Sequence, residues 1–181
     1  RVQIVGTPDY GLECCPAGYY RSAIVVRADD TRTTLAGFSA AKLAFNMAHS
    51  QSGFAALYTH TRPLSFWFTN RIQTGGHLRS AQMVANGQAD IASIDAHTWR
   101  LIQRYEPMAA HLRVLEYTTP TPGLPYITGP EHDPLLIYEA VTEAIASLDT
   151  ADAEALDLRK VIRIDPVQYL AVPTPPASAA L

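Results

Sequence analysis

The sequence predicts an α/β fold, because short apolar runs typical of strands alternate with amphipathic segments typical of helices. The chain has 181 residues, of which 48% are hydrophobic and 17% are charged. A disordered chain would be poorer in apolar residues, so this composition indicates a folded protein that is long enough to bury a core. The alternation of strands with helices further predicts mainly parallel strand pairing.

The predicted strands are short runs rich in aliphatic and aromatic residues, which favour extended structure. They end before a Pro- and Ala-rich segment, 172–180, whose composition predicts an extended and poorly ordered end. Strands are expected at 2–5, 22–27, 42–45, 64–68, 89–94, 112–117 and 160–164.

Helix signals lie between these runs. Asp133 is a capping residue type, Pro134 suits the first helical position, and apolar residues follow at the 3.6-residue period. Gly87 is a typical residue after a helix C-terminus, and Gly53 precedes a short helical pattern. Helices are expected at 54–59, 78–86, 97–105 and 134–148.

Composition and motifs argue against several classes of function. The net charge is −3 and the pI about 6.0, whereas nucleic-acid-binding proteins usually carry a basic surface. No apolar run approaches the ~20 residues of a membrane span, so a spanning chain is not expected. Cys14 and Cys15 are adjacent and have no partner motif for a metal site, so we expect two small side chains in a loop before Pro16. Neither a metal nor a cofactor is expected.

Three predicted strand-to-helix turns share small and hydroxyl residues. Residues 46–53 read N-M-A-H-S-Q-S-G, residues 74–77 read T-G-G-H, and residues 94–98 read I-D-A-H-T. Because parallel strands end at the same edge of a sheet, we expect these turns to form a crevice there. The free N–H groups and the dipole of each helix start favour an anion in such a crevice.

Side chains of these turns suit the same chemistry. The hydroxyls of Ser50 and Ser52 can donate to an anion, and Gly53 lets the backbone approach it closely. His77 can add a donor near neutral pH. Asp95 would repel a phosphate but could hold an ammonium group.

Structural and catalytic interpretations of the same residues stay open. Ser and Thr before a helix are common caps, His77 fits a capping or surface position, and Asp95 fits an N-cap. Ser52, His77 and Asp95 are also the residue types of a catalytic triad. However, the sequence lacks the G-x-S-x-G motif of a nucleophile elbow, the P-loop spacing and G-x-G-x-x-G. We therefore expect no catalytic residue.

Four ordered motifs support a family resemblance. They are G-Y-Y-R-S-A-I-V-V at 18–26, S-Q-S-G at 50–53, T-G-G-H at 74–77 and A-D-I-A-S-I-D at 89–95, and P-G-L-P at 122–125 also fits. From Val2 to Tyr169 the chain resembles the phosphonate, phosphite and phosphate substrate-binding proteins of ABC transporters.

This resemblance implies a type II periplasmic-binding fold, in which two α/β lobes enclose a ligand cleft. Residues 1–27 with 118–181 would form the first lobe, and residues 28–117 the second, which carries the three turns. In the family the S-x-S-G segment and the His of the next turn hold the phosphonate oxygens, and an acidic residue meets a ligand amine. The ligand-binding residues implied in this way are Tyr20, Ser50, Gln51, Ser52, Gly53, Thr74, His77 and Asp95.

The implied function is that of a monomeric, periplasmic or otherwise extracytoplasmic solute-binding protein, which passes a phosphonate or related phosphorus oxyanion to an ABC permease. Gln51 departs from the family, which more often has a small hydroxyl residue there. The family's opening strand–helix unit is also missing, and no signal peptide precedes Arg1, so we expect that the N-terminal segment is lacking. The alternatives are a sulfonate, nitrate or heterocyclic precursor as ligand, or a sensory or enzymatic domain on this scaffold.

Overall fold

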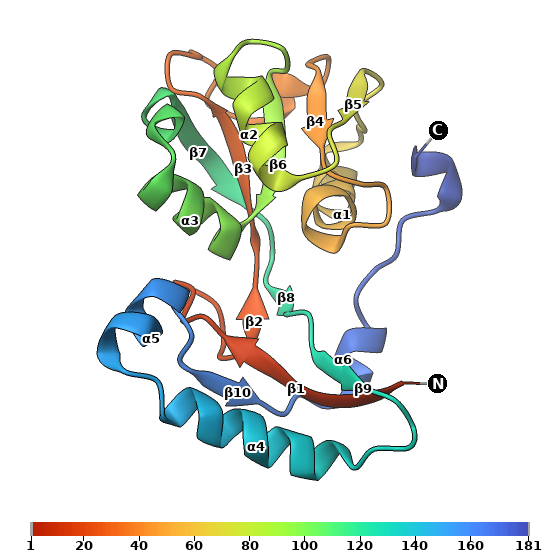
Figure 1. Ribbon diagram of the computed structural model, residues 1–181. Coiled ribbons are helices and arrows are strands. Elements are labelled where there is room, and N and C mark those ends of the chain that lie inside the picture. Colours follow the sequence, from red (N-terminus) through yellow and green to blue (C-terminus); the bar gives the residue numbers. More distant parts are fainter. Residues whose placement is uncertain (1, 181) are drawn as a thin grey trace. The chain divides into compact units, whose positions relative to one another are not determined.

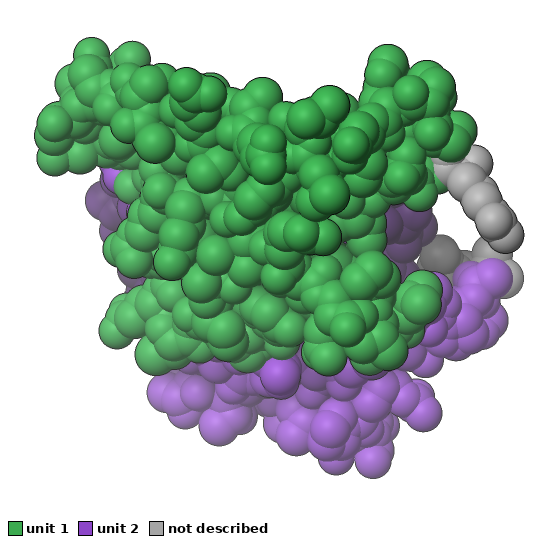
Figure 2. All heavy atoms as spheres, turned by 90° about the horizontal axis from the view of Figure 1, so that it is seen from below, with its two compact units in different colours: residues 1–20, 120–172 green, residues 21–119, 173–181 purple. Residues whose placement is uncertain are grey.

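The computed structural model describes residues 2–180, which form two compact units (Figure 2). Unit 1 contains the chain up to Tyr20 together with Pro120–Val172, and unit 2 contains Arg21–Thr119 together with the chain from Pro173. This division differs from the expected one of 1–27 with 118–181 against 28–117. The strand at 22–27 and the tail both belong to unit 2.

Unit 2 is built on a five-stranded sheet with the strand order β5-β4-β6-β3-β7 (Figure 1). Strand β4 pairs in parallel with β5 and β6, whereas β3 pairs antiparallel with both β6 and β7. Its strands are β3 (Ser22–Arg27), β4 (Leu43–Phe45), β5 (Arg71–Gln73), β6 (Ile91–Asp95) and β7 (Leu112–Tyr117).

The expectation of mainly parallel pairing is therefore wrong, because β3 is inserted in the reverse direction. Parallel neighbours in a sheet are joined by a crossover, usually a helix, within that sheet. Strand β3 instead enters the sheet directly from unit 1. One edge of the sheet consequently gathers the carboxyl ends of β4, β5, β6 and β7 together with the start of β3. We call it the site edge.

Helices follow the strands at the site edge. A π-helix at Gln51–Ala55 runs directly into α1 (Ala56–Thr61), α2 (His77–Ala85) follows β5, and α3 (Ala96–Tyr105) follows β6. The helices expected at 54–59, 78–86 and 97–105 are thus confirmed, with starts shifted by one to three residues. Short 3₁₀ turns lie at Leu35–Phe38, Arg62–Leu64, Pro107–His111 and Ala177–Ala180.

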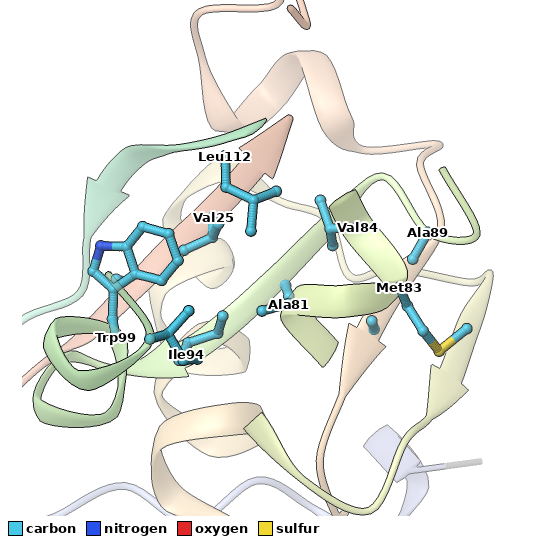
Figure 3. Packing of buried hydrophobic residues seen from close by; sticks show 12 residues of the cluster. Val25, Ala81, Met83, Val84, Ala89, Ile94, Trp99 and Leu112 are labelled. Atoms are coloured by element: carbon cyan, nitrogen blue, oxygen red, sulfur yellow. The ribbon is translucent and has the colours of Figure 1, made fainter. Parts of the chain in front are cut away.

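Buried side chains form one cluster on each face of the sheet, because neighbouring residues of a strand point to opposite faces. Val25 belongs to the cluster that includes residues of α2 and α3, shown in Figure 3 with Ile94, Trp99 and Leu112. Ile24 and Val26 belong to the other cluster, which includes the buried rings of four phenylalanines and which we call the aromatic cluster. Together these clusters hold the site edge on a rigid base.

The strand expected at 64–68 is wrong. Pro63 lies in the 3₁₀ turn, and Ser65 takes a left-handed φ of 59°, so the backbone bends instead of extending. The aromatic side chains that suggested a strand pack edge-to-face on the neighbouring helix. Trp67 contacts the rings of Phe54 and Tyr58 at centroid distances of 5.2 and 5.1 Å.

The expectation of a poorly ordered tail is also wrong. Ala179 is buried in the aromatic cluster of unit 2, and its carbonyl accepts hydrogen bonds from Trp67 Nε1 at 2.9 Å and from Arg71 Nη1 at 2.8 Å. The small side chain of Ala179 fits against the rings, and the two donors hold its backbone.

Unit 1 contains a three-stranded antiparallel sheet with the order β10-β1-β9 and a separate pair, β2 with β8. The strands expected at 2–5 and 160–164 and the helix at 134–148 are confirmed, whereas β2, β8, β9 and two short helices were not expected. Its elements are β1 (Gln3–Asp9), β2 (Tyr19–Tyr20), β8 (Thr121–Pro122), β9 (Tyr126–Thr128), α4 (Pro134–Ala146), α5 (Thr150–Leu156), β10 (Lys160–Ile162) and α6 (Pro166–Leu170).

The helix caps in unit 1 follow the sequence signals. Asp133 accepts a hydrogen bond from the N–H of Leu135, and Pro134 occupies the first helical position, as predicted. Cys14 and Cys15 lie in a turn before Pro16 and are not joined by a disulfide. Within residues 2–180, no helix is long and apolar enough to cross a membrane.

Candidate functional site

The three polar turns meet at the site edge of unit 2. Figure 1 shows that the arrowheads of β4 and β6 point to this edge, where α1 and α3 lie. The turn after β5 joins them because β5 is parallel to β4, and the N–H of Gly75 donates to the carbonyl of Asn46 at 3.0 Å. The expected convergence of the turns is therefore observed within one unit.

The S-Q-S-G segment forms the start of a helix. Ser50 has extended backbone and caps the helix, since its Oγ accepts a hydrogen bond from the N–H of Gly53 at 3.1 Å. Gln51 is half-buried and is the first residue of the π-helix. The capping interpretation of Ser50 is thus correct, and its hydroxyl hydrogen is still available for a further acceptor.

Ser52 is the most firmly held residue of this segment. Its carbonyl accepts two side-chain hydrogen bonds, from Ser93 Oγ at 2.6 Å and from Ser22 Oγ at 2.9 Å. Both donors are buried in strands, at 0% and 1% exposure respectively. The backbone at Ser52 is therefore fixed to β6 and β3.

The side chain of Ser52 contacts His77, the first residue of α2. Ser52 Oγ lies 3.0 Å from His77 Nε2, and the other ring nitrogen, Nδ1, is buried. Burial lowers the pKa of the imidazole, while the Asp95 carboxylate and the backbone of Ser93 act in the opposite direction. Ser52 and His77, two residues expected in the site, are thus brought into direct contact.

A residue that the sequence did not single out, Asn46, completes this contact. Asn46 is buried, its Oδ1 accepts from the N–H of Met47 at 2.8 Å, and its Nδ2 lies 3.4 Å from His77 Nε2. A Cβ at Gly53 would lie 1.9 Å from Asn46 Oδ1. Glycine is required at position 53 because the Asn46 amide occupies this space.

Thr74 has a role within its own turn. Its Oγ1 lies 3.1 Å from the carbonyl of Phe45, 3.0 Å from that of Gly76 and 2.7 Å from Ser80 Oγ. These contacts tie the turn to the end of β4 and to the first turn of α2, so they place His77.

Asp95 caps α3, which agrees with the interpretation of this residue as an N-cap. Its Oδ1 accepts from the N–H of Thr98 at 2.8 Å, and the residue is half-buried. Tyr20 lies in unit 1, where β2 pairs with β8 and Tyr20 is opposite Thr121. The other seven expected ligand-binding residues all belong to unit 2.

Ser22, Ser93 and Asn46 are the residues that sequence reasoning missed. Ser93 interrupts an otherwise apolar strand and Ser22 begins another, and a buried hydroxyl in a strand needs a hydrogen-bond partner. That signal could have identified both serines. Within residues 2–180, no group of three or more His, Cys, Asp or Glu residues could hold a metal ion.

Comparison with known proteins places this site in a family context. The model of the family described as periplasmic substrate-binding proteins of phosphonate ABC transporters matches residues 5–169. No curated protein sequence matches the chain.

Solved structures share the fold at low sequence identity. PhnD1 of Prochlorococcus marinus, in complex with methylphosphonate, aligns with a TM-score of 0.72 and 13% identity over 93% of this chain and 67% of its own. A binding protein component of an ABC phosphonate transporter from Pseudomonas aeruginosa aligns with a TM-score of 0.65 and 18% identity over 93% and 58%. A chloride-bound protein from Xanthomonas citri aligns with a TM-score of 0.70 and 17% identity over 94% and 67%. The chain thus spans about 58–67% of the length of these proteins.

Proposed function

We propose that the site edge binds the headgroup of a phosphonate. The reason is that the chain belongs to the family of periplasmic substrate-binding proteins of phosphonate ABC transporters. The fold is that of type II periplasmic binding proteins, and the family is one of solute binders and not of enzymes. The bound solute would be passed to an ABC permease, and the protein would act outside the cytoplasm.

One observation carries the assignment of the headgroup to the site edge. Ser52 and His77 stand side by side at the starts of two helices that come from different strands. Both helix starts point unpaired N–H groups and partial positive charge toward this edge. An oxyanion there would bind beside side chains whose positions are already fixed by the fold, which reduces the entropic cost of binding.

The remaining expected residues take graded roles in this proposal. The hydroxyl hydrogen of Ser50 and the backbone at Gln51 would face the oxyanion, and Gly53 would keep the backbone close to it. Thr74 would act by holding its turn. Asp95 would meet an amine on the ligand.

Tyr20, which lies in unit 1, would contact the ligand as the family resemblance implies. Its aromatic ring can pack against an apolar part of the solute, and its hydroxyl can donate a hydrogen bond to an oxyanion.

Titration calorimetry with methylphosphonate tests the assignment, with methanesulfonate as the comparison anion. Replacing Ser52 by Ala removes one donor to a charged group, so we expect methylphosphonate affinity to fall about 10- to 100-fold. Ser39→Ala is the matched control, because Ser39 is exposed and lies away from the site edge, and its affinity should equal that of the unmodified protein. Equal affinities for Ser52→Ala and Ser39→Ala would refute the headgroup site.

A second variant separates the two interpretations of Asp95. Asparagine can also cap a helix, so Asp95→Asn keeps α3 capped while removing the charge. If Asp95 meets an amine, this variant loses more affinity for 2-aminoethylphosphonate than for methylphosphonate. A loss that is the same for both ligands would show that Asp95 is structural.

A further inference from the structure

The Asn46 side chain has one orientation that satisfies its neighbours. Its Oδ1 accepts from the N–H of Met47 at 2.8 Å, and rotating the amide by 180° would place its NH₂ group against that donor. The NH₂ group is therefore the part that lies 3.4 Å from His77 Nε2. With 6% of Asn46 exposed, water does not compete for this contact.

An amide NH₂ group can only donate, so it favours His77 with a lone pair on Nε2 and the proton on Nδ1. The surroundings of Nδ1 agree with this tautomer. Nδ1 is buried and makes no hydrogen bond to any residue that the structure describes, so the contacts of the ring with Asn46 and Ser52 are both made by Nε2. The backbone of Ser93 favours a proton on the ring. Ser52 Oγ, at 3.0 Å, can then donate its hydrogen to the same Nε2 lone pair.

This arrangement does not suit an anion as it stands. While the Ser52 hydroxyl donates to His77, its hydrogen is not available to a ligand oxygen. A proton on Nε2 reverses the contact, because the ring then becomes the donor and the Ser52 hydrogen is released toward the ligand. The Asn46 NH₂ group opposes this protonation, since it would face an N–H.

We propose that Asn46 is a positioning residue that presents His77 as a neutral ring with its proton on Nδ1, and that capture of an anion draws a proton from solvent onto Nε2. The second half of this inference rests on the proposed function, whereas the first half concerns the protein without ligand. Among the described residues, Asp95 on β6 is the charged group that acts on His77, and it favours the protonated ring. Asn46, which follows β4, and Ser52 in the π-helix are uncharged.

The decisive variant is Asn46→Asp, which replaces one NH₂ group by an oxygen. The carboxylate can still accept from Met47, but its second oxygen faces Nε2 and favours a proton there. His77 should then bind its proton at least about tenfold more tightly than in the unmodified protein. Asn86→Asp is the control, because Asn86 is exposed at the opposite end of α2 and gives the same change of charge.

Nitrogen-15 NMR of the full chain without ligand reports both the tautomer and the titration of His77. The Nδ1–H tautomer is expected at neutral pH, and a proton on Nε2 would overturn the inference, as would equal strengthening of proton binding in Asn46→Asp and Asn86→Asp. If Asn46→Asp does not fold, Asn46→Ala removes the amide donor without adding charge, and the same direction of change is expected.

Calorimetry with methylphosphonate in two buffers of different ionisation enthalpy tests the coupling. The number of protons taken up on binding should be larger for the unmodified protein than for Asn46→Asp or His77→Gln. Because His77→Gln has no ring to protonate, its uptake measures the protons that methylphosphonate itself takes up. Binding with the same uptake in all three proteins would overturn the coupling and leave the proposed function standing. No binding by the unmodified protein would refute the proposed function, while the NMR result would still decide the role of Asn46.

Discussion

Substituting alanine for Gly53 is the sharpest test of how the site is built. Gly53 lies in a π-helix without a positive φ, so helix propensity alone would favour alanine by about 1 kcal/mol. The added Cβ would however lie 1.9 Å from Asn46 Oδ1 and 2.6 Å from its Cγ. Overpacking costs about 1–3 kcal/mol, and loss of the Asn46 bond to Met47 costs about 1 kcal/mol more. We therefore expect Gly53→Ala to lower the free energy of unfolding by about 1–3 kcal/mol.

Urea unfolding followed by tryptophan fluorescence measures this change, because Trp67 and Trp99 both lie in unit 2. Gly37→Ala is the matched control. Gly37 lies in a 3₁₀ turn and an added Cβ would have no neighbour closer than 3.7 Å, so it should leave stability unchanged or raise it. If Gly53→Ala were as stable as the unmodified protein, the reasoning about the Asn46 amide would be refuted. The double variant with Asn46→Ala should cost less than the sum of the single changes, because the obstructing group is gone.

Two further outcomes concern unit 2 away from the site. Deleting residues 173–181 removes the buried Ala179 and the acceptor for Trp67 Nε1, so we expect a loss of about 1–3 kcal/mol and a red-shifted tryptophan emission; an unchanged emission maximum and urea midpoint would contradict the docking of the tail. The hydrogen bond from Arg32 holds the pKa of Asp30 at about 2, below its ordinary 3.8. Stability from this carboxylate is then complete above pH 3.8 and is lost as pH falls through 2, on the order of 1–2 kcal/mol. Asp30→Asn should be less stable than the unmodified protein at pH 6, and the difference should shrink as pH falls through 2. A difference that does not depend on pH would exclude this ion pair as its cause.

The sequence was sufficient to place the three turns at one edge because their positions depend on local signals. Capping residues, glycines and apolar runs mark where each strand ends and each helix begins, and β4, β5 and β6 are in fact parallel. The contact of Ser52 with His77 then follows from sheet geometry. The family resemblance, carried by the same motifs, agreed with the family match.

The contacts that hold the site edge from within unit 2 could not be predicted from local sequence signals. Ser22 reaches the carbonyl of Ser52 because β3 is reversed beside β6, and no local pattern records the direction of a strand that enters from another unit. Aromatic residues at 66–68 look alike in a strand and in a loop packed on a helix. The position of Ala179 depends on a pocket of rings that is formed by residues more than 100 positions earlier.

The reversal of β3 has a consequence for the two stretches of chain that connect the units. Because β3 begins and β7 ends at the site edge, the chain enters and leaves unit 2 beside each other there. Ser22 N–H donates to Thr118 Oγ1 at 2.9 Å, and Thr118 N–H donates to the Ser22 carbonyl at 3.0 Å, so the two connections are clamped together.

On the unit 1 side, the pairing of Tyr20 with Thr121 forms a second clamp. Between the clamps lie Arg21 on one connection and Thr119 and Pro120 on the other. These three residues separate the two clamps. Ser22 of the first clamp also donates its hydroxyl to the Ser52 carbonyl at 2.9 Å, so the residue that joins the two connections also supports the backbone at Ser52.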